Sequence, residues 1–290
     1  MQTFIQLTVS GLANGAILAL AAVGFAIIFK ATGVINFAQG AFMAVGAYMV
    51  YTAIADFGWA WPLAIAFAAL IAILLGMGTE RFILRPMVGE SAISVIMVTI
   101  GLAFFLEASL QFQFGTRPLR MAPFIPEGTV LILDVPLPLN RLIAIGLAAL
   151  VLGAVGAFFR YSRNGIAMRA VADDQQAALT MGISVRRIFA MAWGIAAVTA
   201  MLAGVLVANI QGVSGNVALF GLLVFPVVIL GGLDSIGGTI VGGLIVGLLI
   251  QYTAGYLGGG LQQVVPYILL VFILMVRPYG LFGEVRIERV

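Results

Sequence analysis

The chain has 290 residues, of which 63% are hydrophobic and only 9% are charged, and it contains no cysteine and no histidine. About a quarter of the residues of a soluble globular domain are charged, so this composition excludes a soluble protein and predicts an integral membrane protein. Without cysteine or histidine, disulfides, thiolate chemistry and the usual proton shuttle are excluded, and we expect neither an enzyme nor a cofactor in this chain. The net charge of +3 rests on few residues and indicates arginine-rich cytoplasmic loops, so no nucleic-acid partner is expected.

The N-terminal apolar run, residues 5–29, is predicted to be a retained first membrane span. It lacks the basic start and the cleavage site of a removable signal peptide, and it is too long for one. A helix crosses the roughly 30 Å of hydrocarbon with about 20 apolar residues. By this criterion the further blocks are 34–54, 61–79, 92–112, 140–159, 188–210, 218–232, 236–255 and 263–277.

The expected fold class is therefore an all-α polytopic membrane protein, with one transmembrane domain over residues 1–290. Block 218–232 is short and lies between glycine-rich turns, VSGNVALFG before it and GGLDSIGG after it. It is expected to be a broken or re-entrant helix, which leaves eight or nine transmembrane helices.

Lysine and arginine near the ends of spans mark the cytoplasmic side. With nine crossings and the loop 160–187 inside, eleven basic residues lie inside and three lie outside, which predicts an outside N-terminus and a cytoplasmic C-terminus. The inside set is Lys30, Arg81, Arg85, Arg160, Arg163, Arg169, Arg186, Arg187, Arg277, Arg286 and Arg289, and the outside set is Arg117, Arg120 and Arg141.

The segment 113–139 is the long outer, periplasmic loop of this arrangement. It is rich in proline and contains the alternating run VLILDV. These features indicate a small hairpin or lid over the outer face, and a plain connector is the alternative.

The loop 160–187 is the one long charged stretch between two apolar segments. Within it, Gln176-Ala177-Ala178 followed by Gly182 resembles the EAA-x3-G signature of permease subunits of ABC importers, with Gln in place of Glu. A short amphipathic helix over about 174–181, turning at Gly182, would suit a cytoplasmic coupling helix that docks on a partner. The alternative is a solvated positive-inside loop, and the Ile-x-Leu-Pro that follows the glycine in that family is absent.

Further motifs resemble the Liv-type branched-chain amino acid permeases, in their H-subunit branch. They are Leu12–Gly15 with Ala19, Leu20 and Gly24; Val34–Gly40 leading to Gly46–Tyr48; the loop Arg163–Gly182; Gly231–Gly238 running into Gly242 and Gly243; and Arg277–Gly283. The matches follow the family's order and cover most of the chain.

This resemblance implies a pore-forming subunit in a bacterial inner membrane. Its partners would be a second related permease, two cytoplasmic ATPases that bind ATP and Mg²⁺, and a periplasmic substrate-binding protein. Branched-chain amino acids (Leu, Ile, Val) are the first expectation for the substrate, and urea or short amides are the second. The ATPase-coupling residues would be Arg169, Asp173, Asp174, Gln176, Ala177, Ala178, Gly182, Arg186 and Arg187.

The residues themselves exclude ATP hydrolysis by the P-loop route. A Walker A loop needs a lysine followed by serine or threonine, and the single lysine, Lys30, precedes Ala31. Energy must therefore come from a partner subunit or from an ion gradient. The glycine-rich run after residue 234 has no basic residue, and the small-xxx-small spacing of Gly238, Gly242, Gly243 and Gly247 predicts helix packing instead.

Polar residues at membrane depth are costly unless they are paired or face water. A path for a zwitterion with an aliphatic side chain should be mostly apolar with a few hydrogen-bonding groups. The candidates are Asn14, Asn36, Gln39, Thr99, Glu107 and Asn209. The alternative for each is a hydrogen bond that clamps two helices.

Two other transport mechanisms compete with an ATP-driven permease. A secondary transporter could use Glu107 or Asp234 as a proton or cation site, and a passive channel would need only the bundle. One isolated acid without histidine is a poor proton relay, and a channel does not need a 28-residue charged loop, so the ATP-driven permease is favoured. Glu80 with Arg81, and Asp234, are expected at the membrane interfaces.

Overall fold

A computed structural model describes residues 1–120, 124–126, 128–132, 135–258 and 260–283 of the chain. The described part is helical apart from one hairpin and short connections. The α-helices are α1 (Gln2–Thr32), α2 (Gln39–Ala55), α3 (Trp61–Gly78), α4 (Ala92–Phe114), α5 (Leu139–Tyr161), α6 (Arg163–Asp173), α7 (Gln175–Thr180), α8 (Val185–Gln211), α9 (Asn216–Leu222), α10 (Val224–Gly231), α11 (Ile236–Tyr256) and α12 (Val265–Val276). A π-helical segment η1 (Thr79–Leu84) and a 3₁₀ turn η2 (Arg85–Met87) continue α3, and a 3₁₀ turn η3 (Leu261–Gln263) precedes α12.

Six helical segments among the described residues are long and apolar enough to cross a membrane. They are Gln2–Thr32, Trp61–Met87, Ala92–Phe114, Leu139–Tyr161, Val185–Gln211 and Ile236–Tyr256. The predicted class, an all-α membrane protein, is confirmed. The predicted spans 34–54, 218–232 and 263–277 correspond to shorter apolar helices, so the number of complete crossings stays a prediction.

Block 218–232, which the sequence marks as broken or re-entrant, forms two helices, α9 and α10, that separate at Leu223. Pro226 gives the local reason. Proline has no backbone N–H, and its ring clashes with the carbonyl group four residues earlier, here that of Leu222. The first helix therefore ends at Leu222, and the second begins with proline in its first turn.

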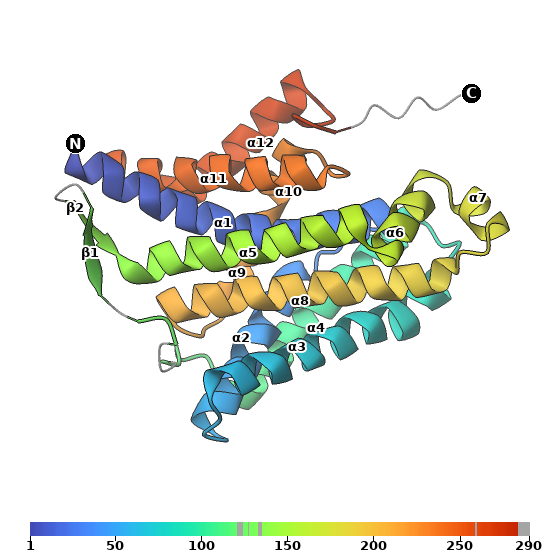
Figure 1. Cartoon of the computed structure of the whole chain (residues 1–290), viewed down its shortest axis with the longest axis horizontal. Coiled ribbons are helices and arrows are strands. Elements are labelled where there is room, and N and C mark those ends of the chain that lie inside the picture. Colours follow the sequence, from blue (N-terminus) through green and yellow to red (C-terminus); the bar gives the residue numbers. More distant parts are fainter. Residues whose placement is uncertain (121–123, 127, 133–134, 259, 284–290) are drawn as a thin grey trace.

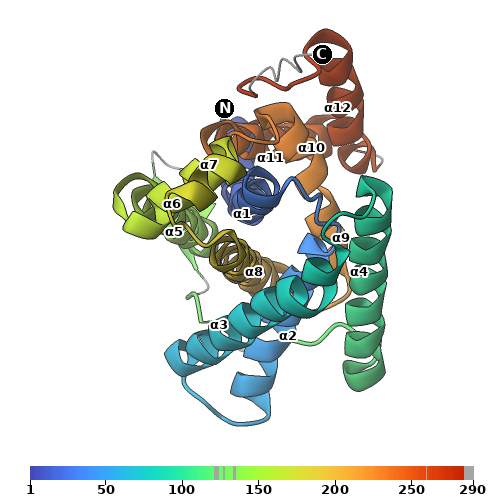
Figure 2. The ribbon, with the colours of Figure 1, turned by 90° about the vertical axis from the view of Figure 1, so that its right-hand side faces the viewer.

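The bundle is organised around α1 and α8, which lie at its centre when it is viewed along its length (Figures 1 and 2). In their most apolar stretches 83% of α1 and 72% of α8 are buried, against 17% for α4 and 22% for α5. The outer helices expose large apolar side chains, such as Phe104, Phe105 and Leu150. This pattern is expected where lipid, rather than water, surrounds the bundle.

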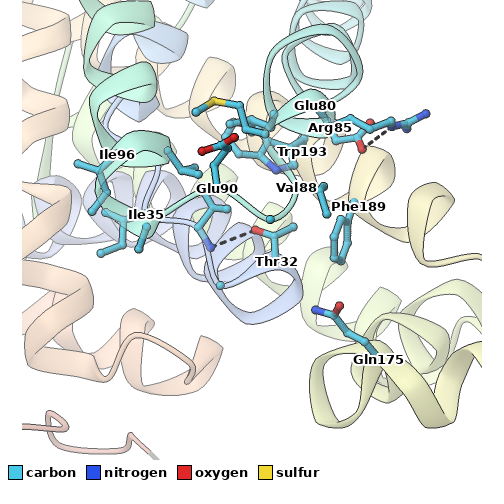
Figure 3. Close-up of a pocket in the computed structure, with 17 residues that line it drawn as sticks. Thr32, Ile35, Glu80, Arg85, Val88, Glu90, Ile96, Gln175, Phe189 and Trp193 are labelled. Carbon is cyan, nitrogen blue, oxygen red and sulfur yellow. Dashed lines mark hydrogen bonds and ion pairs between the residues drawn. The ribbon is translucent and has the colours of Figure 1, made fainter.

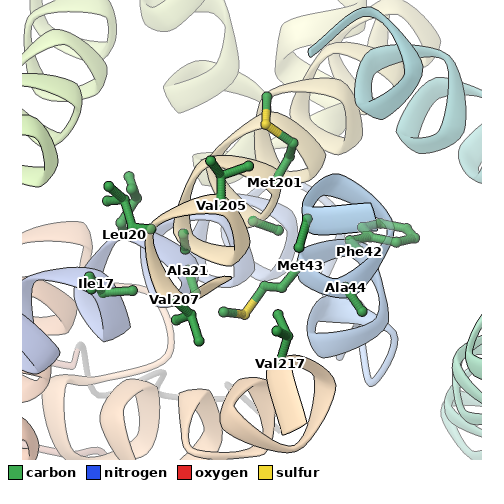
Figure 4. Close-up of a cluster of buried hydrophobic side chains, with 14 of the residues drawn as sticks. Ile17, Leu20, Ala21, Phe42, Met43, Ala44, Met201, Val205, Val207 and Val217 are labelled. Atoms are coloured by element: carbon green, nitrogen blue, oxygen red, sulfur yellow. The ribbon is translucent and has the colours of Figure 1, made fainter. Parts of the chain in front are cut away.

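The hydrophobic core lies where α1, α2, α8 and α9 meet (Figure 4). Small residues allow the backbones to approach closely in this region. A Cβ atom at Gly46 of α2 would lie 2.6 Å from the Cα atom of Met201 of α8, and one at Gly221 of α9 would overlap Gly40. Close packing of helices through small residues is the usual arrangement in membranes.

The four glycines expected to pack helices lie on two sides of α11. Gly238 and Gly242 face α10, where an added Cβ would overlap the carbonyl oxygens of Gly231 and Val227. Gly243 and Gly247 face α1: a Cβ at Gly243 would lie 2.7 Å from the Cβ of Ala19, and one at Gly247 would overlap Gly15. α11 can therefore contact both neighbours closely.

The segment 113–139 contains an antiparallel hairpin of β1 (Thr129–Ile132) and β2 (Val135–Pro138), in which Val130 lies opposite Leu137. Of the alternating VLILDV run, residues 133 and 134 lie outside the described residues. A second pairing, Leu119 with Val213, connects the segment to the end of α8. The extended hairpin, rather than a plain connector, is what the described residues form.

The bundle has two distinct ends, which we call the α7 end and the hairpin end (Figure 1). The α7 end holds α6, α7, the last turns of α1, α5 and α12, and η1, whereas the N-terminus and the hairpin lie at the other end. The described basic residues expected inside lie on the elements of the α7 end or directly beside them, whereas Arg286 and Arg289 lie outside the described residues. Of the residues expected outside, Arg141 is in the first turn of α5, and Arg117 and Arg120 lie between α4 and the hairpin.

Candidate functional site

The site begins where α1 ends and the chain folds back toward α2. Gly33 adopts φ 71° and donates its N–H to the carbonyl of Phe29 (2.8 Å). The side-chain oxygen of buried Asn36 accepts a hydrogen bond from the N–H of Ala38 (3.0 Å), directly before α2 begins. The predicted span 34–54 is therefore helical only from Gln39, and residues 33–38 are non-helical backbone within the bundle.

Three of the six candidate path residues gather at this break. Asn36 Nδ2 donates to Gln39 Oε1 (3.1 Å), and Gln39 Nε2 donates to the carbonyl of Ala21 on α1 (2.9 Å) and, at 3.4 Å, to that of Ala196 on α8. Thr99 of α4 donates its hydroxyl to the carbonyl of Ile35 (3.2 Å) and accepts from the N–H of Phe37 (3.3 Å).

All three side chains of this polar cluster, Asn36, Gln39 and Thr99, are at most 1% exposed, and all are hydrogen-bonded. A buried polar group left without a partner costs about 1–3 kcal/mol, so the cluster fastens α1, α2, α4 and α8 together. The same three side chains are therefore the polar groups expected of a path and the helix clamps that the alternative interpretation expects.

The other three candidates lie apart from the polar cluster. Asn14 is half-buried on α1, Glu107 is half-buried on α4, and neither side chain makes a hydrogen bond to another described residue. Asn209 lies near the hairpin end of α8, and both of its amide atoms are buried without a partner within the described part of the chain.

A cavity of about 350 Å³ opens at the α7 end and borders the polar cluster (Figure 3). The end of α1, the η1–η2 turn and the start of α4 line it, together with Gln175 of α7 and two aromatic residues of α8, Phe189 and Trp193. Ile35 and Ile96 also line it. Their carbonyl oxygens lie 3.2 and 2.9 Å from Thr99 Oγ1 and accept hydrogen bonds from this hydroxyl. The cavity and the polar cluster therefore share a wall.

The cavity wall contains an ion pair that sequence reasoning missed. Arg85 donates from Nε to Glu80 Oε1 (3.1 Å) and from Nη2 to Glu80 Oε2 (2.6 Å). Such two-point arginine–carboxylate pairs are among the stronger hydrogen-bonded contacts in proteins. Glu80 is only 3% exposed and pairs with Arg85, whereas the neighbouring Arg81 is exposed, and the expected position of Glu80 and Arg81 at a membrane interface stays a prediction.

The π-helical segment explains this pairing. In η1 the N–H of Arg85 donates to the carbonyl of Glu80, which is the i to i+5 bond of a π-helix. Residues five apart thus lie above one another, whereas in an α-helix the neighbours would be three or four apart. The five-residue spacing in the sequence therefore did not indicate a pair.

At the α7 end, α7 is a separate short helix whose start and end are each defined by a specific residue. The Asp174 carboxylate caps it by accepting from the N–H groups of Gln176 (2.8 Å) and Ala177 (3.0 Å). It ends before Gly182, which adopts φ 80°. A helix was predicted over about 174–181 with a turn at Gly182, and a helix with these limits is present. The preceding helix α6 was not predicted, although its Ser162 cap is a recognisable N-terminal signal.

The expected coupling residues divide into two groups. Ala178 is 4% exposed and packs in a cluster with Met168 of α6 and Ile188 of α8, so it attaches α7 to its own chain and is not free to touch a partner. The others are exposed: Arg169, Asp173, Asp174, Gln176, Ala177, Gly182, Arg186 and Arg187. Sequence reasoning missed Leu179 and Met181, which are 57% and 81% exposed beside them.

Two further observations concern metal binding and an ion-driven mechanism. They contain no group of three or more carboxylate, cysteine or histidine residues that could hold a metal ion. Asp234, the second candidate for an ion-driven mechanism, lies half-buried between α10 and α11.

Comparison with known proteins supplies the family. The family described as "Branched-chain amino acid transport system / permease component" matches residues 7–274. The high-affinity branched-chain amino acid transport system permease protein LivH of Escherichia coli strain K12 is 30% identical over 302 residues, covering 99% of this chain and 98% of LivH. BraD of Pseudomonas aeruginosa, a permease of the same description, is also 30% identical, with 99% and 98% covered.

A more distant relative is the probable branched-chain amino acid transport permease protein LivH of Methanocaldococcus jannaschii. It is 28% identical over 293 residues, which cover 92% of this chain and 89% of the relative. The resemblance found in the sequence motifs is confirmed over nearly the whole chain. The chain belongs to the family of branched-chain amino acid transport system permease components.

Proposed function

We propose that this chain is the membrane-spanning permease subunit of an ATP-binding-cassette importer that moves leucine, isoleucine and valine across a bacterial inner membrane. The names of its relatives support the substrate class. The α7 end would face the cytoplasm, with the N-terminus outside and the C-terminus inside, in agreement with the concentration of arginine at that end.

The observation that carries the proposal is the arrangement of α7. This helix is capped at one end by Asp174 and turned at the other by Gly182, and buried Ala178 fixes it against α6 and α8. Its remaining surface is exposed and includes two apolar side chains, Leu179 and Met181. An apolar helix face outside the membrane spans suits docking into a groove of a partner ATPase.

Movement of α7 has a direct route to the membrane interior. Gln175 at the start of α7 lines the cavity, and the cavity shares its wall with the polar cluster. A shift of α7 against α8 would therefore change the shape of the cavity and act on the hydrogen bonds that fasten the α1–α2 break. Coupling through such packed contacts and hydrogen bonds is the usual physical route between distant sites.

The two helix breaks indicate where the path runs. Phe37, in the break between α1 and α2, stacks on Phe225, next to the break between α9 and α10, with ring centroids 4.6 Å apart. Non-helical backbone at membrane depth is tolerated only where protein buries it or water reaches it, and broken helices in transporters commonly surround the substrate path. We place the path along these breaks, with Asn36, Gln39 and Thr99 as its polar groups.

The remaining partners follow from the same proposal. A second, related permease would complete the path, two cytoplasmic ATPases would bind ATP and Mg²⁺, and a periplasmic protein would deliver the substrate. Urea and short amides are the rival substrates. A secondary transporter is the rival mechanism, because Glu107 has no hydrogen-bond partner among the described residues.

The coupling role can be tested with two matched glycines. Gly182 and Gly58 both have positive φ, 80° and 66°, and open space at the position of a Cβ atom, but Gly58 lies in the turn between α2 and α3. A side chain in this backbone region is strained, so valine should distort each turn by a similar amount. Radiolabelled leucine and urea uptake would be measured with the complete transporter in proteoliposomes containing ATP.

Gly182→Val is expected to lower ATP-driven leucine uptake by about ten-fold or more, whereas Gly58→Val should leave it near the wild-type rate. Equal uptake by both variants would refute the coupling role. Uptake of urea but not leucine would assign the other substrate, and leucine uptake without ATP would indicate a gradient-driven transporter.

A further inference from the structure

The cavity at the α7 end is lined by three charged side chains whose chemistry the proposed function does not use. They are Glu80, Arg85 and Glu90. At about 350 Å³ the cavity is within the size range of small-molecule sites. A cavity of about 400 Å³ between α3, α5 and α8 has only apolar residues in its wall. The cavity at the α7 end can therefore recognise charge as well as shape.

Arg85 supplies the positive charge of the cavity. It donates to Glu80 from Nε and Nη2, and its Nη1 makes no hydrogen bond to another described residue. The side chain of Glu80 is 4% exposed and that of Arg85 is 34% exposed, so the buried carboxylate holds the guanidinium from behind. A guanidinium has five N–H donors in a rigid plane, and two of them are used here. The remaining donors are available to a second carboxylate.

Glu90 supplies the negative charge that is not already paired. It lies in the turn between η2 and α4, it is exposed, and no hydrogen bond or ion pair joins its carboxylate to another described residue. Thr32 and Gly33 line the same cavity at the end of α1, where a helix carries a partial negative charge. Both features favour a cationic group, such as an ammonium, on this side of the cavity.

Apolar side chains occupy the wall between the two charged sides. Figure 3 shows Glu90 and the Glu80–Arg85 pair on the two sides of Trp193. Ile35, Ile96 and Phe189 line the cavity as well. An aliphatic side chain of a ligand would be removed from water against this wall. The wall therefore combines a carboxylate-binding group, an ammonium-binding group and an apolar surface.

We propose that this cavity binds a free α-amino acid with an aliphatic side chain. The ligand carboxylate pairs with Arg85, its ammonium group pairs with Glu90, and its side chain lies against Ile35 and Phe189. The inference rests on the proposed function, in which the same amino acid is transported and the α7 end faces the cytoplasm. The cavity then holds the amino acid between the polar cluster and its release, in contact with α7 through Gln175.

The first test compares leucine with two analogues that each lack one charged group. The complete transporter is purified in nanodiscs without the periplasmic binding protein, and saturation-transfer NMR measures the binding of leucine, 4-methylpentanoate and 3-methylbutylamine. Leucine should bind at least about ten-fold more tightly than either analogue, because each analogue loses one charge-assisted contact. No leucine binding, or equal affinity for leucine and one analogue, would overturn the inference.

Two variants locate the binding in this cavity. Glu90→Gln should lower the affinity for leucine by about ten-fold but leave that for 4-methylpentanoate unchanged, because this analogue has no ammonium group to lose a partner. A general structural defect would weaken both ligands. Val88→Trp should lower the affinity for both, because Val88 lines the cavity and is 77% exposed, so a larger side chain can occupy the cavity.

Each variant has a matched control that does not line the cavity. Asp56→Asn removes an exposed carboxylate in the turn after α2, and Val276→Trp enlarges a 62% exposed valine at the end of α12. Both should bind leucine as the wild type does. Unchanged leucine affinity in Glu90→Gln and Val88→Trp would overturn the inference, and so would an equal loss in the variants and their controls.

Uptake measured in parallel separates this inference from the proposed function. Proteoliposomes with the binding protein and ATP report leucine transport, whereas the nanodiscs report binding to the cavity. Leucine uptake by the wild type without leucine binding to the cavity would overturn the inference and leave the proposed function intact. Leucine binding that is lost in Glu90→Gln and Val88→Trp, without any leucine uptake, would support the amino-acid site and overturn the proposed function.

Discussion

The Glu80–Arg85 ion pair allows a prediction in which the two partners behave differently. The side chain of Glu80 is 4% exposed, whereas that of Arg85 is 34% exposed. Removing the arginine leaves a carboxylate enclosed by protein, but removing the carboxylate leaves a guanidinium that already reaches solvent. The free energies of unfolding of the two single variants should therefore differ.

Arg85→Gln is expected to lower the free energy of unfolding by about 3–5 kcal/mol, the usual cost of an uncompensated buried charge. Glu80→Gln should cost only about 1–2 kcal/mol, because two hydrogen bonds are lost but the remaining charge is partly hydrated. The double variant carries neither charge and should be close to the milder single variant.

Denaturant titration of the purified protein in detergent micelles measures these differences. Arg81→Gln is the control, because Arg81 is exposed one position after Glu80 and should change the free energy of unfolding by no more than about 0.5 kcal/mol. The reasoning is refuted if Glu80→Gln destabilises the protein as much as Arg85→Gln, or if the double variant is less stable than Arg85→Gln alone.

Three further predictions concern packing, capping and the rival mechanism. Gly243→Leu should prevent stable assembly of the chain, because an added Cβ meets Ala19 of α1 at 2.7 Å, while Gly237→Leu, which has open space, should assemble normally on size-exclusion chromatography. Asp174→Ala removes the cap of α7, a loss of about 1 kcal/mol to that helix, and should reduce leucine uptake more than Asp173→Ala, whose side chain caps nothing. Glu107→Gln should leave ATP-driven uptake within about two-fold of wild type, and loss of both uptake and gradient dependence would favour the secondary transporter.

The sequence by itself determined the membrane class, the approximate positions of the apolar helices and the family. The lengths of apolar runs define helices that can cross a bilayer, and these lengths are local properties of the chain. The limits of α7 were equally local, because Asp174 is a capping residue and Gly182 tolerates a positive φ. The break in the block 218–232 was also predictable from its glycine-rich flanks and short length.

Only the tertiary structure decided which polar residues meet. Gln39 contacts the carbonyl of Ala196, 157 positions away in the chain, and no local pattern specifies such a contact. The π-helical segment paired Glu80 with Arg85 at a spacing that α-helical rules do not favour. Burial of Ala178, and of Asn209 without a partner, likewise depends on which helices pack around each side chain, and this packing is fixed when the whole bundle assembles.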